Sequence, residues 1–143
     1  MNILFVYPTV FLPNHGGVER VTHLLSNEFK QRGHKIYHLH THAYNNFICP
    51  DFSTLFFPSP NYNDPINILF YHRIIKENNI DIIINQCGAH NDSVLFNNVG
   101  KTKAKVISVI HFAPKMFLEH YWSEVSTLRD NSLKEKIKRM LVK

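Results

Sequence analysis

The stretch that decides the fold is NILFVYPTVFLPNHGG, residues 2–17. Its first six residues, Asn2 to Tyr7, are a continuous β-prone apolar run in which polar and apolar positions do not alternate. Such a run is typical of a strand that helices cover on both faces, as in a parallel sheet. The remainder is a loop with two prolines that ends in Gly16 and Gly17. The sequence therefore predicts a buried strand, a loop and the start of a helix.

The residues after this loop predict a helix that closes at Gly33, where a glycine commonly follows a helix end. Its apolar positions share one stripe, with Leu24 beside it: Val18, Val21, Leu25 and Phe29. The next segment, HKIYHLHT (residues 34–41), predicts a second strand. Together these elements form the first β-loop-α-β unit of a Rossmann-like sheet.

Farther along, residues 47–65 mix aromatic residues with four prolines, which indicates a short strand between irregular loops. Residues 65–79 predict a helix with Asp64 as N-cap and Pro65 at its first position. The positions that follow its helical spacing are Ile68, Leu69, His72, Ile75 and Lys76.

Two more runs, IDIIIN (80–85) and VISVIH (106–111), have the fully buried pattern, with a short helix through Val94 and Phe96 between them. Strands that alternate with helices predict an α/β fold: a Rossmann-like parallel sheet with helices on both faces and right-handed crossovers.

Length and composition fit one soluble domain: 143 residues, 44% apolar and 19% charged. The opening MNILFVYP has neither a basic head nor a cleavage site, and no apolar run spans a bilayer, so a cytoplasmic location is expected. Residues 115–143 predict helices, and no strand follows the last segment, SLKEKIKRMLVK. We therefore expect residues 1–143 to be a single Rossmann-like domain that is cut inside its fold.

The excess positive charge lies in the last third of the chain. Residues 1–100 carry six Lys/Arg against seven Asp/Glu, and residues 101–143 carry ten against four. The basic C-terminal helix is compatible with a solvated face, a contact with an anionic membrane surface, or nucleic acid. Nucleic acid is the least favoured, because no aromatic residues interleave with the lysines. The two cysteines, Cys49 and Cys87, allow neither a disulfide framework nor a four-thiolate zinc site.

Ligands of an open parallel sheet bind beyond the carboxyl ends of its strands, which selects residues 8–17, 86–91 and 111–115. In the first loop, Gly16 and Gly17 let a ligand approach the backbone at a helix start, where free N–H groups favour an anion such as phosphate. The pair matches neither a GxGxxG fingerprint nor a P-loop. A turn that needs positive φ explains it equally well.

Histidines fall in all three selected loops: His15, His90 and His111. His111 ends a predicted strand, where it would bond a substrate hydroxyl or, alternatively, be satisfied by local backbone. The even spacing of His38, His40 and His42 places three imidazoles on one strand face, which admits a shared metal. With no carboxylate or cysteine nearby, we favour structural histidines and expect no metal.

The first 41 residues resemble the amino terminus of GT-B glycosyltransferases, in particular the retaining nucleotide-sugar enzymes of glycosyltransferase family 4. The matching positions are the Gly-Gly pair, the Glu and Arg that follow it, and a later Gly-His: Gly16, Gly17, Glu19, Arg20, Gly33 and His34. VISVIHFAP resembles the family's strand that ends in a histidine, which is His111 here. The resemblance covers most of residues 1–115.

The family resemblance implies a two-domain enzyme whose N-terminal domain mainly binds the acceptor and whose C-terminal domain binds the nucleotide sugar. It implies that Gly16 and Gly17 face the donor diphosphate and that His111 lies near the transferred sugar. It also implies that the reaction uses no catalytic metal or other cofactor and that the enzyme acts in polysaccharide biosynthesis. Many family members bind the inner face of the membrane peripherally and act on lipid-linked acceptors, so the resemblance implies such a membrane contact as well.

The sequence thus predicts the N-terminal, acceptor-side domain of a retaining hexosyltransferase-type enzyme that acts on a glycan or lipid-linked acceptor. The donor domain is absent, so the chain alone is expected to be inactive. Its acceptor rim is assigned to Asn14, His15, His90 and Asn91. The alternative is a stand-alone α/β module that binds a nucleotide or phosphorylated ligand without catalysis.

Overall fold

The computed structural model describes residues 1–12, 14–41, 51–61, 64–88 and 93–111. The chain divides into two compact units, Met1–Ile110 and His111–Lys143. All elements described below belong to the first unit.

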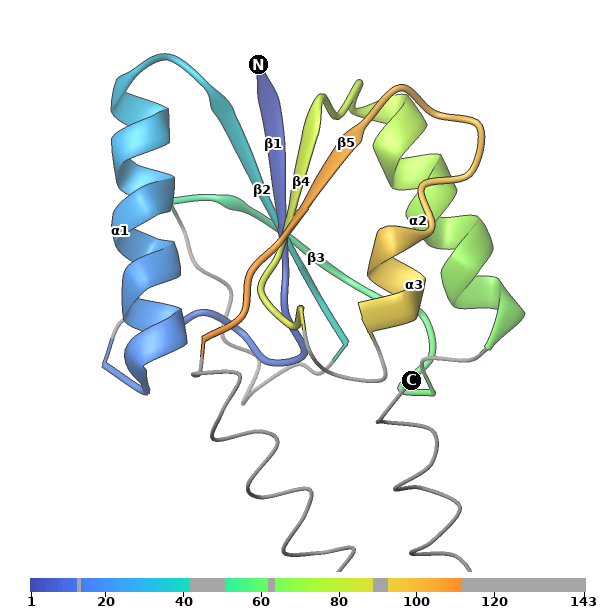
Figure 1. Ribbon diagram of the computed structural model, residues 1–143, viewed down its shortest axis with the longest axis horizontal. Helices are drawn as coiled ribbons and strands as arrows, with labels where there is room; N and C mark the ends of the chain where they lie inside the picture. The colour runs from blue at the N-terminus through green and yellow to red at the C-terminus, as the bar shows by residue number, and fades with distance from the viewer. Residues whose placement is uncertain (13, 42–50, 62–63, 89–92, 112–143) are drawn as a thin grey trace, which may run out of the picture. The chain divides into compact units, whose positions relative to one another are not determined.

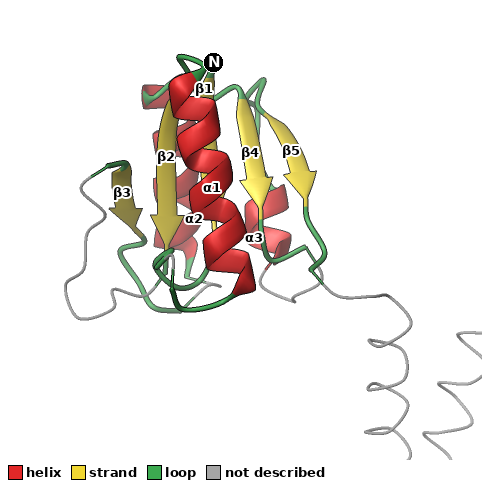
Figure 2. Ribbon diagram, turned by 90° about the vertical axis from the view of Figure 1, so that its left-hand side faces the viewer, coloured by secondary structure: helices red, strands yellow, loops and turns green. Residues whose placement is uncertain are grey.

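Five parallel strands form one sheet in the order β3-β2-β1-β4-β5 (Figures 1 and 2). Their bounds are β1 Asn2–Val6, β2 Lys35–His40, β3 Ser53–Phe56, β4 Ile82–Asn85 and β5 Lys105–Ser108. The order reverses at β1, since β2 and β4 pair with opposite edges of this strand. The predicted Rossmann-like parallel sheet is confirmed, and its topological switch point lies between β1 and β4.

Helices cover both faces of the sheet. Helix α1 (Gly17–Gln31) lies on one face, and α2 (Pro65–Glu77) and α3 (Ser93–Asn97) lie on the other (Figure 1). In Figure 2, α1 stands in front of the sheet with its start at the edge to which the strand arrows point. That edge holds the carboxyl ends of all five strands, because the strands are parallel.

Successive side chains of β1 enter two separate cores. Leu4 and Val6 join the core under α2 and α3, and Ile3 and Phe5 join the core under α1. All four are at most 2% exposed. The uninterrupted apolar run of β1 is therefore explained by burial on both faces.

The predicted apolar stripe of α1 describes its buried face only in part. Phe29 packs against the core under α1, but Val21, Leu24 and Leu25 are 46%, 60% and 37% exposed, whereas Thr22 and Ser26 are fully buried. Periodicity located the helix but did not identify the small polar residues that face the sheet.

Polar groups on the sheet explain why α1 turns its small polar residues inward. Gln86 Nε2, just beyond β4, donates to Thr22 Oγ1 over 2.9 Å. His38 on β2 is hydrogen-bonded through Nε2 to Ser26 Oγ, also over 2.9 Å. A buried amide or imidazole that lost its partner would cost about 1–3 kcal/mol, so these bonds orient the helix.

The predicted start signal of α2 and the predicted end signal of α1 are confirmed. The Asp64 side chain accepts the Ile66 N–H, and Pro65 begins α2. Gly33, after the end of α1, has φ +80°, which few residues other than glycine adopt.

At two places, side chains that the sequence predicts to be buried are exposed in the structure. Leu69 on α2 is 70% exposed, and the buried face of this helix includes Asn67 and Tyr71 instead. The run at 106–111 is not fully buried: Ile107 and Ile110 are 51% and 53% exposed. The reason is that β5 is an edge strand of the described sheet, and α1 lies over the other half of that face (Figure 2).

The corrected face of α2 predicts unequal costs for two truncations on the same helix. We expect Leu69→Ala to change the free energy of unfolding by less than about 0.5 kcal/mol, because its side chain is exposed. Ile75→Ala should cost about 2–5 kcal/mol, because Ile75 is 2% exposed in the core. Urea denaturation of both variants measures the difference, and equal losses would contradict this orientation of α2.

Candidate functional site

A pocket of about 590 Å³ lies at the start of α1, on the carboxyl edge of the sheet. Four of the predicted site residues line it: Asn14, His15, Gly16 and Gly17. The sequence did not predict that the other three lining residues, Arg20, His23 and Leu24, belong to a binding pocket. Helical spacing from Gly16 would have found them, because positions three to four residues apart share a face.

The helix start in this pocket has no side-chain cap. Gly16 occupies the N-cap with extended backbone and, as a glycine, makes no side-chain cap hydrogen bond to the first amides of α1. These N–H groups and the positive end of the helix dipole favour a negatively charged group. The exposed Arg20 adds a cation to the pocket lining.

The two glycines are not equivalent. A Cβ on Gly17 would meet nothing within 4 Å, so the space beside it is open. A Cβ on Gly16 would lie 2.5 Å from Glu19 Oε2, so the Glu19 carboxylate folds back over the N-cap. The pocket therefore offers an anion an open approach at Gly17, with a negative side chain beside Gly16.

The same carboxylate lies close to the switch point of the sheet. Tyr7 follows β1, and its pKa is raised by burial and by the negative charges of Glu19 and Cys87. Cys87 follows β4, so the Tyr7 hydroxyl is influenced by groups on α1 and after β4, near the point where the strand order reverses. Sequence reasoning named Glu19 only within the family motif and gave no site role to Tyr7 or Cys87.

The loop after β4 contacts the segment after β5 at Gly88. Its N–H donates to the Val109 carbonyl over 3.0 Å, and a Cβ at this position would lie 2.5 Å from that carbonyl oxygen. Only glycine allows this backbone-to-backbone approach.

We expect Gly88→Ala to destabilise the protein by about 1–3 kcal/mol, because the new methyl group meets a backbone carbonyl that cannot move aside locally. Gly17→Ala is the matched control, since its Cβ has open space. Thermal denaturation of the two variants checks this. A Gly88→Ala protein as stable as the control would contradict the close contact.

The histidines of β2 are core residues. His38 and His40 are 1% and 0% exposed and pack among aromatic rings, including that of Phe11. Burial lowers the pKa of His38 to about 3, helped by the nearby His40 and His23. Burial also lowers the pKa of His40 to about 4, against the raising effect of the bond from its Nδ1 to the Tyr7 carbonyl.

These contacts support the structural interpretation of the strand histidines rather than the metal hypothesis. Within the described ranges, no three His, Cys, Asp or Glu side chains are grouped so as to hold a metal ion. His42 lies outside the described residues.

The lowered pKa values predict a loss of stability in acid. Both histidines bind protons below pH 6.5 in the unfolded chain but only below about 4 in the native one. The two buried neutral histidines contribute fully to the free energy of unfolding above pH 6.5. This contribution is lost as the pH falls, at up to about 2.7 kcal/mol per pH unit near pH 5. We expect His38→Leu to halve this slope, measured by urea denaturation from pH 7 to 4.5. His15→Gln, at an exposed position, is the control; an unchanged slope in His38→Leu would count against a neutral buried imidazole.

The remaining predicted site residues are His90, Asn91 and His111. His90 and Asn91 lie outside the described residues. His111 is exposed, follows the end of β5 by three residues and begins the second compact unit. Its role stays a prediction.

No helix in the described part of the chain is long and apolar enough to cross a bilayer. Fold and pocket together define a Rossmann-like α/β domain with a helix start that has no side-chain cap at the carboxyl edge of its sheet. Residues 15–142 match the family model of Glycosyltransferase Family 4, and the chain belongs to this family, as an N-terminal domain of GT-B type. Its function is therefore of the glycosyltransferase class, with a sugar donor and an acceptor as substrates. No curated protein matches the chain.

Proposed function

We propose that this chain is the acceptor-side domain of a retaining glycosyltransferase that moves a hexosyl group from a nucleotide sugar to a glycan or lipid-linked acceptor. The supporting observation is the open, uncapped helix start at Gly16 and Gly17, in a chain of glycosyltransferase family 4. The donor-binding domain lies outside these 143 residues, and the chain alone does not transfer sugar.

The donor diphosphate approaches α1 at Gly17. There the first amides of the helix donate to phosphate oxygens, and the guanidinium of Arg20 neutralises part of the charge. A side chain at Gly17 would occupy the space that the phosphate needs. The carboxylate of Glu19 repels a phosphate placed over Gly16, which directs the anion toward the Gly17 side.

The acceptor binds along the rim formed by Asn14 and His15, together with His90 and Asn91. Both Asn14 and His15 are exposed in the pocket lining, where an amide and an imidazole can bond sugar hydroxyls. His111 bonds a hydroxyl of the transferred sugar. Retention requires no inverting base, so we assign His111 a hydrogen-bonding role and not that of a general base.

We place the protein in the cytoplasm and in polysaccharide biosynthesis, with no metal or cofactor in the reaction. The basic C-terminal segment is the proposed point of contact with the inner face of the membrane; it lies outside the described residues.

A second function is favoured by one observation: every residue that lines the pocket belongs to the first compact unit. Binding of a nucleotide or phosphorylated ligand at this pocket would then need no other domain. On this alternative, the chain is a binding module without catalysis.

We test the phosphate assignment by titrating inorganic pyrophosphate into the ¹⁵N-labelled chain. Saturable shifts are expected at the amides of residues 16–20 in the NMR spectrum, and Gly17→Val should abolish them by filling the approach. The unliganded variant should keep its melting temperature, because a Cβ at Gly17 meets nothing within 4 Å. Gly33→Asn, at the other end of α1, is the control, since asparagine tolerates positive φ there.

Pyrophosphate that leaves residues 16–20 unshifted, or that binds Gly17→Val equally well, contradicts the donor-side assignment. Transfer of sugar by the purified chain above the rate of a His111→Ala variant contradicts the proposed inactivity. In the protein that joins this chain to its donor domain, His111→Ala should lower turnover far more than stability. Equal losses of both would remove His111 from the site.

A further inference from the structure

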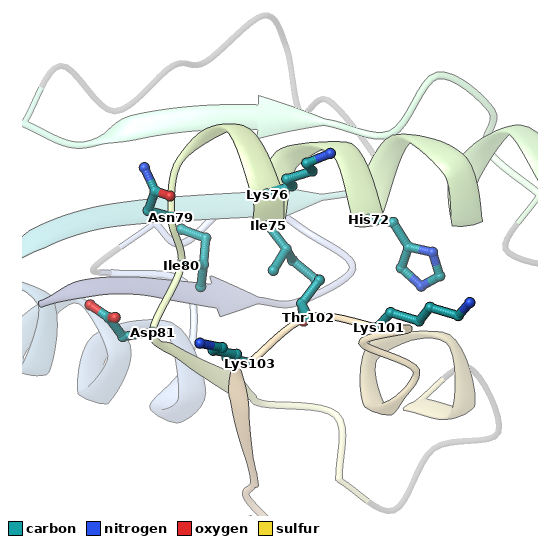
Figure 3. Close-up of a pocket in the computed structure, with 9 residues that line it drawn as sticks. All are labelled: His72, Ile75, Lys76, Asn79, Ile80, Asp81, Lys101, Thr102 and Lys103. Atoms are coloured by element: carbon teal, nitrogen blue, oxygen red, sulfur yellow. The ribbon is translucent and has the colours of Figure 1, made fainter.

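A second open pocket, of about 640 Å³, lies at the amino edge of the sheet, opposite the candidate site. Helix α2 forms one wall, and the segments that enter β4 and β5 form the other (Figure 3). Nine residues line it: His72, Ile75, Lys76, Asn79, Ile80, Asp81, Lys101, Thr102 and Lys103. Strands of four to six residues separate the two edges by at least about 13 Å, so a ligand here is remote from the helix start at Gly17.

The lining carries an excess of positive charge. Lys76 comes from α2, and Lys101 and Lys103 come from the loop before β5 (Figure 3). Among the described residues, none of these three ammonium groups has a carboxylate within ion-pair distance. The one acidic side chain in the lining, Asp81, already accepts the Asn2 N–H at Oδ2 over 2.7 Å.

Three lysines around one pocket leave a local excess of positive charge, which a bound anion would neutralise. Two of the three described lysines in the last third of the chain, Lys101 and Lys103, thus line the same pocket as Lys76. A singly charged ligand would leave this excess unbalanced, whereas a phosphate group brings up to two negative charges and several acceptor oxygens. Lysine binds phosphate as a mobile point charge.

The frame that carries the lysines is fixed. His72 Nε2 donates to the Asn98 carbonyl over 2.9 Å, and Gly100, at φ +59°, lies so close that a Cβ there would be 2.9 Å from the His72 ring. Thr102 Oγ1 donates to the Val99 carbonyl over 2.9 Å. These contacts hold the loop against α2 without using the lysine side chains.

The lysine side chains themselves are free to adapt. Lys101 and Lys103 are exposed and extend in opposite directions from Thr102 (Figure 3). Rotamers of exposed side chains interchange within nanoseconds, so the ammonium groups can converge on an anion while the backbone stays in place. The apolar floor, Ile75 and Ile80, is 2% and 5% exposed and provides a rigid base.

We propose that this pocket binds a phosphate group, carried by a small soluble anion or by the headgroup of an anionic lipid. The site is distinct from the proposed donor approach at Gly17, and it does not depend on that proposal. It gives the domain an anion contact on the edge away from the transfer site.

The test is a titration of the ¹⁵N-labelled chain with inorganic phosphate and pyrophosphate. We expect saturable shifts at the amides of residues 79–81 and 101–103, separate from those of residues 16–20. The double variant Lys101→Gln/Lys103→Gln should weaken this binding by about tenfold or more. Lys30→Gln/Lys35→Gln removes the same charge from α1 and β2, outside the pocket, and should leave it unchanged.

Cosedimentation with phosphatidylglycerol vesicles, against phosphatidylcholine vesicles, identifies the source of the phosphate. Vesicle binding that falls in the pocket variant but not in the control variant indicates a lipid headgroup. Pocket shifts with soluble phosphate, together with vesicle binding that is equal in the two variants, indicate a soluble anion. The proposal is overturned if soluble phosphate leaves the pocket amides unshifted and vesicle binding is equal in both variants. It is also overturned if the two variants lose phosphate affinity equally.

Discussion

Burial of β1 on both faces is the constraint on which the rest of this structure depends. Leu4 and Val6 point into one core and Ile3 and Phe5 into the other, and none is more than 2% exposed. A strand buried in this way needs a parallel neighbour on each edge and a helix on each face. The pairing of β1 with β2 and β4 supplies the neighbours, and the order reverses there. The topological switch point, where the loops after β1 and β4 diverge and leave room for a ligand, thus follows from the burial of a single strand.

A polar layer then fixes where α1 begins. Thr22 and Ser26 are fully buried and meet Gln86 and His38 of the sheet, so the helix is aligned by two hydrogen bonds rather than by apolar packing alone. Apolar contacts tolerate sliding, whereas a buried hydrogen bond is lost when its atoms separate by a fraction of an ångström. The position of the first turn, and with it the uncapped amides after Gly16, is held by this polar layer.

The fold could be predicted from the sequence because its signals are local. The unbroken apolar run of β1, the Asp64-Pro65 helix start and Gly33 each act through their own backbone, and the structure bears them out. Which side of α1 is buried depends on partners far away in the chain, such as Gln86, and periodicity does not carry that information. For the same reason, the Gly-Gly loop could be predicted from its sequence, but the influence of Glu19 and Cys87 on Tyr7, and the lysine pocket at the opposite edge, could not.

The two proposed anion sites, at opposite edges of the sheet, would recognise charge by different means. At the carboxyl edge the donors are backbone amides of α1, whose positions are set by the fold and whose access depends on the missing side chain of Gly17. At the amino edge the charge is carried by side chains on a loop that His72 and Gly100 hold in place. Backbone donors are fully oriented before a ligand arrives and so favour one geometry, as a reaction site requires. Mobile ammonium groups accept many geometries, which suits a contact that only has to hold an anion. The sheet thereby separates a demanding site from a permissive one with the same set of strands.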